Sequence, residues 1–165
     1  MRKKLCLILV AVCGMALLAG CGGETQNATS SSPQAESETT HETDKKEQTT
    51  MKMNVQIGDQ TFTATLADTT AAQEFAQMLP MTITLDDYGG FEKVGSLGRS
   101  LTTSNSQTTT AAGDIVLYNG SNIVMFYGSN SWSYTRLGKI DDLTGWANAL
   151  GHGSVSVTFH LAGDR

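Results

Sequence analysis

Cysteine, proline and aromatic residues are scarce in this chain. Its 165 residues include 3 cysteines and 2 prolines, and Phe, Trp and Tyr together make up 7%. Cys6 and Cys13 belong to an apolar stretch at the start of the sequence, so Cys21 is the only cysteine beyond it. One cysteine cannot form an internal disulfide. A small fold held together by disulfides is therefore excluded, and the rest of the chain needs an apolar core.

The sequence also lacks the common catalytic and metal-binding motifs. It has no G-x-S-x-G sequence, no glycine-rich phosphate loop and no cysteine after Cys21 that could act as a nucleophile. His41 lies in a polar segment, and the spacing of His152 and His160 fits no compact pair of metal ligands. We therefore expect no metal, no cofactor and no hydrolase chemistry.

Acidic residues outnumber basic ones, with 16 Asp and Glu against 11 Lys and Arg. Three of the basic residues, Arg2, Lys3 and Lys4, precede the first apolar stretch. Without them the chain keeps eight basic residues against the same 16 acidic ones, a net charge of −8. Such a charge repels phosphate groups, so neither nucleic acid nor anionic lipid headgroups are expected partners.

Residues 1–20 read MRKKLCLILVAVCGMALLAG, a basic start followed by an apolar run too short to span a bilayer comfortably. This pattern predicts an export signal. Its end, Leu18-Ala19-Gly20-Cys21, resembles the lipobox of bacterial lipoproteins, in which the signal is removed before a cysteine that then carries lipid. An ordinary secretory signal cleaved after Gly20 would instead leave Cys21 as a free thiol. We expect the lipidated form, anchored in the cell membrane on its extracytoplasmic face.

Residues 21–50 are expected to be the lipidated cysteine followed by a disordered tether. After Cys21 this segment contains no aromatic or large aliphatic residue, so it cannot bury enough apolar surface to offset the entropy of ordering it. A loose coil of this length reaches roughly 30 Å on average. Residues 51–165, which hold most of the large apolar side chains, are predicted to form one domain.

Alternating apolar residues predict two β-hairpins in this domain. Residues 51–66 read MKMNVQIGDQTFTATL, with alternation on both sides of a Gly58-Asp59 turn. Residues 114–127 read DIVLYNGSNIVMFY, and their turn contains Asn119-Gly120, a pair that favours positive φ angles.

Two more strands are predicted at residues 81–88 and 154–161, which alternate in the same way. A short amphipathic helix is predicted from Thr70 to Pro80, and a helical turn or two within residues 141–151. Seven or eight short strands with two short helices favour a mainly β fold, a closed barrel filled by alternate side chains.

Residues 89–113 lack clear periodicity and contain several glycines, which predicts long loops around brief strands. Loops of this length inside a compact domain often carry function.

The domain resembles the bacterial cyclophilin-like family over roughly residues 51–161. The resemblance depends most on three stretches, DYGGFEKVG at 87–95, GDIVLY at 113–118 and SWSYTRLGKI at 131–140. It implies a cyclophilin-like closed eight-stranded β-barrel with a helix at each end.

Cyclophilins are peptidyl-prolyl isomerases, and the resemblance places Phe126 near their pocket aromatic, Trp132 at their ligand-facing tryptophan and Tyr134 where they carry a histidine. It also offers Gln107 as the counterpart of a glutamine in their cleft. The strand with their arginine, in a Phe-His-Arg sequence, has no match here. Without that guanidinium the group that stabilises the transition state is missing, unless Arg99 or Arg136 replaces it.

The candidate residues allow two interpretations. For Tyr118, Phe126 and Tyr127 we favour barrel core over ligand contact, whereas Trp132, in a polar context, suits either equally. Arg136 could contact a ligand or pair with Asp141 or Asp142. Our candidates for ligand contact are Tyr88, Gln107, Phe126, Trp132, Tyr134 and Arg136.

Two charged residues close to Tyr88 are also open to interpretation. Glu92 and Lys93 could line the mouth of a pocket together with Tyr88, or they could be solvated. For Lys93 we prefer solvent exposure.

Two functions follow from these observations. We expect a monomeric, lipid-anchored binding module for a peptide or small-molecule ligand, such as a segment of an exported protein, without isomerase activity. The alternative is a peptidyl-prolyl isomerase that acts as an extracytoplasmic foldase.

Overall fold

A computed structural model of the protein describes residues 50–163. The predicted signal, Cys21 and residues 22–49 lie outside these residues. Within them no helix is long and apolar enough to cross a membrane. The elements, in chain order, are β1 (Lys52–Ile57), β2 (Gln60–Leu66), α1 (Thr70–Ala76), β3 (Met81–Tyr88), β4 (Glu92–Ser96), β5 (Ser106–Thr109), β6 (Asp114–Tyr118), β7 (Asn122–Phe126), β8 (Ser131–Ile140), α2 (Trp146–Leu150) and β9 (Val155–Leu161).

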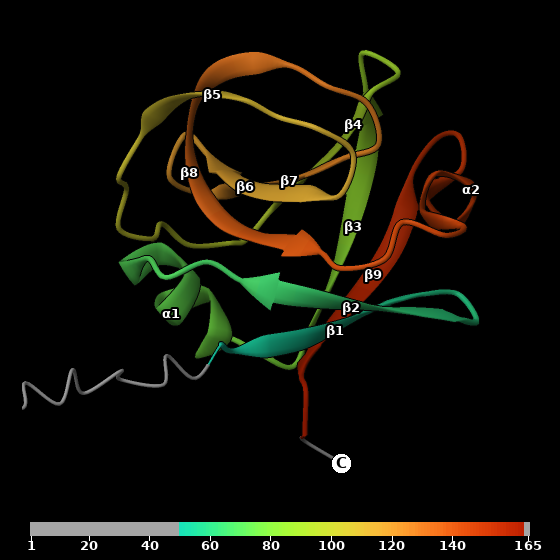
Figure 1. Cartoon of the computed structure of the whole chain (residues 1–165), viewed down its shortest axis with the longest axis horizontal. Helices are drawn as coiled ribbons and strands as arrows, with labels where there is room; N and C mark the ends of the chain where they lie inside the picture. Colours follow the sequence, from blue (N-terminus) through green and yellow to red (C-terminus); the bar gives the residue numbers. More distant parts are fainter. Residues whose placement is uncertain (1–49, 164–165) are drawn as a thin grey trace, which may run out of the picture. The chain divides into compact units, whose positions relative to one another are not determined.

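Eight of these strands form a closed antiparallel barrel (Figure 1). They are hydrogen-bonded in the order β2-β1-β9-β3-β4-β7-β6-β8, and β8 pairs back onto β2 to close the ring. The remaining strand, β5, pairs only with the first part of β8, from Ser131 to Tyr134. The expected fold class, a mainly β closed eight-stranded barrel with two short helices, is confirmed.

Closure of the barrel depends on a glycine. In the pairing of β2 with β8, Gly138 lies opposite Leu66. A Cβ atom placed on Gly138 would lie 2.7 Å from the backbone oxygen of Thr65, closer than real Cβ atoms approach. The two strands can therefore approach each other at this point only because residue 138 has no side chain.

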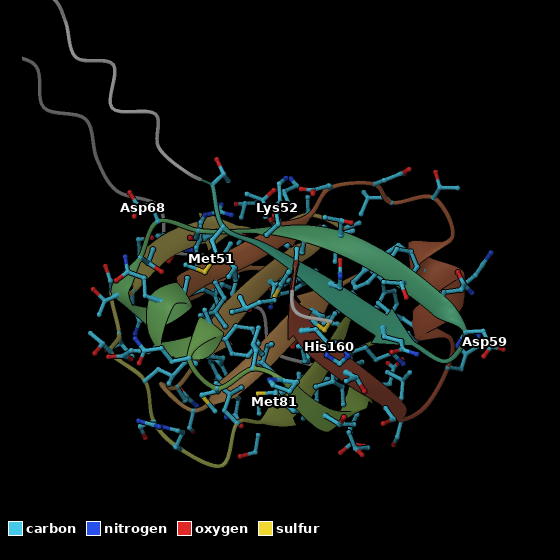
Figure 2. The ribbon with its side chains drawn as sticks, turned by 90° about the horizontal axis from the view of Figure 1, so that it is seen from below. Met51, Lys52, Asp59, Asp68, Met81 and His160 are labelled. Atoms are coloured by element: carbon cyan, nitrogen blue, oxygen red, sulfur yellow. The ribbon has the colours of Figure 1, made fainter. Side chains whose placement is uncertain are left out.

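Both predicted hairpins form. In the β1–β2 hairpin, Lys52 lies opposite Thr65 at the open end, and Asp59 is at the tip (Figure 2). In the β6–β7 hairpin, Asn119 and Gly120 have φ angles of 50° and 72°, as the Asn-Gly pair predicts.

The two helices contribute aromatic side chains to the core and lie on opposite sides of the barrel (Figure 1). Phe75 of α1 meets Phe159 edge to face at 5.5 Å between ring centroids, and Trp146 of α2 meets Phe62 in the same way at 5.1 Å. Helix α1 begins at Thr70, as predicted, because the Thr69 hydroxyl accepts the Ala72 N–H and caps it, and it ends at Ala76, before the predicted limit at Pro80.

Alternation along the strands produces two apolar clusters. Ile123 and Met125 of β7 face the main core inside the barrel, whereas Val124 and Phe126 face outward into a second cluster. The outer cluster consists of Val116, Val124, Phe126 and Tyr134, with Phe91, Val94 and Tyr118 packed against it.

Candidate functional site

A pocket lies over the outer cluster, on the outside of the barrel wall. Its volume is about 360 Å³, near the lower end for small-molecule sites. Strands β3, β4, β6, β7 and β8 and the segment before β8 contribute its lining. The lining residues are Tyr88, Glu92, Val94, Tyr118, Val124, Asn130, Trp132 and Tyr134.

Strand register sets the floor of the pocket. Tyr88 of β3 lies opposite Glu92 of β4, which lies opposite Phe126 of β7. Residues directly opposite each other in a sheet share a face, so these three side chains project to the same side. Two positions further along β4, Val94 lies opposite Val124 on that same side.

Strand β8 supplies one wall. Trp132 is 57% exposed and Tyr134 only 3% exposed, although both line the pocket. The β5 pairing, in which Thr108 lies opposite Trp132, fixes this half of β8. The Thr110 hydroxyl donates to the Asn130 carbonyl at 3.0 Å and accepts the Asn130 N–H at 3.0 Å, which holds the start of the wall.

Tyr134 is the central ring of the site. Its ring lies edge to face with Phe126 at 5.7 Å and with Tyr118 at 6.1 Å. The Asn130 side-chain amide donates to the Tyr134 hydroxyl at 3.1 Å. Burial raises the pKa of Tyr134, and the nearby negative charge of Glu92 raises it further, against the opposing effect of the Asn130 hydrogen bond.

Glu92 is the one ionisable carboxyl group in this lining. It is 6% exposed, and among residues 50–163 no donor lies within hydrogen-bond distance of its Oε2. Burial raises the pKa of Glu92 above its ordinary value. An acidic group without a partner in an aromatic pocket is costly to folding, which makes it a candidate for function.

Lys93, the next residue, faces the other side of β4. It is fully buried, and its Nζ pairs with Asp87 at 2.7 Å and donates to the carbonyl of Gly153 at 2.6 Å. The interpretation of Lys93 as solvated was wrong, because the strand aims this side chain into the barrel beside Met125.

Asp87 and Tyr127 complete the Lys93 network. The Tyr127 hydroxyl donates to Asp87 at 2.8 Å, and Lys93 lies 5.6 Å from the Tyr127 ring centroid. The Lys93 and Tyr127 hydrogen bonds lower the pKa of Asp87. Burial, followed by the hydrogen bond to Asp87, raises the pKa of Tyr127 to about 12. This cluster is internally satisfied and structural.

Three of the six proposed site residues line the pocket together: Tyr88, Trp132 and Tyr134. Phe126 is fully buried and supports Tyr134 from behind.

Two others lie outside the lining. Gln107 sits on β5 opposite Ser133. The Arg136 guanidinium is 3.7 Å from the carboxylate of Asp114, which also lies 3.5 Å from Lys139. The aspartate nearest to Arg136 is therefore Asp114, and the expected pairing with Asp141 or Asp142 was wrong.

The sequence interpretation did not find several lining residues, and Glu92 was left open. Tyr118 was assigned to the core, whereas it is partly exposed and lines the pocket. Alternation on β7, with Val124 and Phe126 on the outer face, was the signal that could have indicated a second apolar face. Val94 and Asn130 carry no distinctive pattern of their own.

Residues 50–163 contain no group of three or more His, Cys, Asp or Glu side chains that could hold a metal ion.

Comparison with known proteins identifies the family to which the domain belongs. Residues 55–160 match the model of the cyclophilin-like family, and the chain belongs to that family. None of the curated proteins compared with the chain matches it.

A solved structure supports the same fold. The solution structure of the hypothetical protein AF2241 from Archaeoglobus fulgidus superimposes with a TM-score of 0.52 at 16% identity, covering 68% of this chain and 95% of that one. At this identity the similarity concerns the fold alone.

Proposed function

We propose that this protein is a non-enzymatic binding module that holds a peptide or small ligand in the pocket of Tyr88, Tyr118, Trp132 and Tyr134. The observation that carries the proposal is the exposure of Trp132 and Tyr88, at 57% and 67%, directly beside buried aromatic residues. Exposed rings around a concave apolar surface are typical of ligand sites.

The charge distribution favours binding over prolyl isomerisation. Isomerase catalysis in cyclophilins, as the resemblance implies, needs a guanidinium close to the prolyl nitrogen. Within residues 50–163 the two arginines are Arg99 and Arg136, and neither lines the pocket. The pocket instead contains Glu92. A negative charge there would disfavour the lone pair that develops on the prolyl nitrogen, which a guanidinium stabilises.

The location forms part of the same proposal. Cys21 would carry lipid at the extracytoplasmic face of the cell membrane, and residues 22–50 would connect it to the barrel. The pocket would then meet peptides or small molecules outside the cytoplasm, with exported proteins as one source. One acyl chain binds a membrane only marginally, whereas a lipoprotein cysteine with two or three chains stays attached.

The two tryptophans of the chain allow a direct test. The full-length protein, labelled with 5-fluorotryptophan, gives one fluorine resonance from exposed Trp132 and one from Trp146, which is 1% exposed. A Trp132→Phe variant assigns the signals. The probes are a set of short N-acetylated peptides and a set of small aromatic and aliphatic fragments.

Probes that bind in the pocket should shift the Trp132 resonance in a saturable way and leave the Trp146 resonance in place. If no probe shifts Trp132, or if both signals move together, the pocket is not the binding site.

A further inference from the structure

The pocket combines four aromatic rings with one buried carboxyl group, and its lining contains no lysine or arginine. We infer that it selects an organic cation: an alkylated ammonium group that sits against Glu92 and is enclosed by Tyr118, Trp132 and Tyr134. This inference rests on the proposed binding function and specifies the chemistry of the ligand.

The first argument is the unsatisfied carboxyl group. Glu92 lines the pocket, and the described residues offer no hydrogen-bond donor to its Oε2. Burial of an acid without a partner destabilises the folded state. A bound cation would supply the missing opposite charge, so the group that weakens the free protein would stabilise the complex.

The second argument is the geometry of the rings. Tyr118 and Tyr134 meet edge to face, and Trp132 and Tyr88 stand exposed around the same pocket. Aromatic faces carry negative electrostatic potential and attract cations, with tryptophan the strongest. Rings that line the same pocket as the carboxylate would therefore add to its attraction for a positive ligand.

The third argument is that the neighbouring cations of the protein are paired elsewhere. Lys93 lies on the opposite face of β4 and pairs with Asp87. Arg136 lies near Asp114 and outside the lining. Neither neutralises Glu92, so an anionic ligand would meet net repulsion in this pocket.

The lining favours an alkylated ammonium over a primary one, because four aromatic rings and two valines make up most of it. A primary ammonium has three N–H donors to satisfy. The Asn130 side-chain oxygen already accepts the Ser131 N–H at 2.8 Å, and its amide nitrogen donates to the Tyr134 hydroxyl. Methyl groups need no acceptors and pack against rings and against Val94 and Val124. The same group occurs in free choline-like molecules and on methylated lysine in a peptide.

A charged and a neutral molecule of the same shape provide the test. Choline and 3,3-dimethylbutan-1-ol differ in that one carries a quaternary nitrogen where the other carries a carbon. Each would be titrated into the full-length protein and followed by the Trp132 fluorine resonance. We expect choline to bind about tenfold more tightly or better, the factor that corresponds to about 1.4 kcal/mol of cation recognition.

Matched variants separate the contribution of Glu92 from general charge. Glu92→Gln keeps the side-chain shape and should sharply reduce the preference for choline, leaving only the contribution of the rings. Asp59→Asn, at the exposed tip of the β1–β2 hairpin (Figure 2), removes the same charge elsewhere and should preserve the preference. Trp132→Ala, followed by calorimetry, should weaken choline binding without changing the fold.

Peptides containing lysine or trimethyl-lysine distinguish the sources of the cation. Tighter binding of the trimethylated peptide than of choline would assign the site to a modified protein, and the reverse to a free small molecule.

The inference fails if the neutral alcohol binds as well as choline, or if Glu92→Gln leaves the preference intact; in both cases the pocket still binds ligands and the proposed function stands. If neither compound binds, while other probes shift Trp132, cation selection alone is overturned. If no probe of any class shifts Trp132, the binding function itself is overturned as well.

Discussion

The indole N–H of Trp146 donates a hydrogen bond to the backbone carbonyl of Phe126 at 2.8 Å. That carbonyl also accepts the Gly113 N–H at 2.8 Å. The Phe126 side chain contacts Tyr134 in the pocket, so Trp146 in α2 helps to hold the strand beneath the pocket.

The two tryptophans should therefore respond differently to substitution. Trp146→Phe removes one hydrogen bond to Phe126 and part of the packing against Phe62, and should lower the free energy of unfolding by about 1–3 kcal/mol. Trp132→Ala removes a mainly exposed ring and should change it by less than about 0.5 kcal/mol. Urea unfolding measures both. Equal losses would mean that Trp132 is a structural residue.

Glu92→Gln should stabilise the protein in a pH-dependent way. Because burial raises the pKa of Glu92 in the folded state, the wild-type loses stability, relative to the variant, as pH rises through that pKa. Below the ordinary pKa of glutamate the acid is protonated in both the folded and the unfolded chain, so the two proteins should be equally stable. Melting temperatures measured from about pH 4 to about pH 8 test this.

The other titratable groups around Glu92 do not reverse this trend. Tyr88, Tyr118 and Tyr134 line the same pocket and are unchanged in the variant. Lys93 and Asp87 pair on the opposite face of β4 in both proteins. A variant that is no more stable than wild type at the higher pH would show that Glu92 is adequately solvated.

Gly138→Ala should weaken the closure of the barrel. The added methyl group would collide with the Thr65 carbonyl of β2, and overpacking of this kind costs about 1–3 kcal/mol. Ser133→Ala, at an exposed position of the same strand, is the control and should be nearly neutral. Thermal unfolding compares the two, and equal melting temperatures would exclude a steric role for residue 138.

The protein should not accelerate prolyl isomerisation. We expect that NMR exchange spectroscopy on an Ala-Pro peptide gives the uncatalysed rate, because no arginine lines the pocket in the described part of the chain. Acceleration that is lost in Trp132→Ala or Arg136→Ala would contradict this prediction and favour the foldase alternative.

Cys21→Ser should prevent lipidation. Cells that express the variant should incorporate no labelled fatty acid into it, whereas the wild-type chain should fractionate with membranes. A chain starting at Met51 should fold alone and stay soluble, because strand β1 begins at Lys52. Labelled Cys21→Ser would refute the lipobox interpretation, and a shortened chain without β circular dichroism would refute the domain boundary.

The strands and hairpins were predictable because one face of each is buried, so their alternation is visible in the sequence. The Asn119-Gly120 turn was equally predictable, because few residues accept its positive φ angles. The charges were harder to place. For Glu92 the sequence left a pocket mouth and solvent open, and for Lys93 it favoured solvent, whereas pairing of β4 with β3 and β7 buries both side chains.

The pocket itself was predicted in part. Trp132 was found because a large ring stood out in a polar segment, and Tyr134 because the family resemblance placed it where cyclophilins carry a histidine. Gln107 depended on a family analogy alone, and Arg136 on its position next to an aromatic strand. Neither the analogy nor the sequence position predicts the direction in which a side chain points. That direction follows from the pairing of β8 with β5 and β6.

Glu92 and Lys93 point to opposite faces of β4, so the register of this strand determines which charge the pocket presents to a ligand. A slip of one residue exchanges the two faces of a strand. Such a slip would place the Lys93 ammonium among the rings and the Glu92 carboxylate beside Met125. The proposed site for cations would then become one for anions. Single-residue insertions within β4 should therefore be far less tolerated than insertions in the β1–β2 turn.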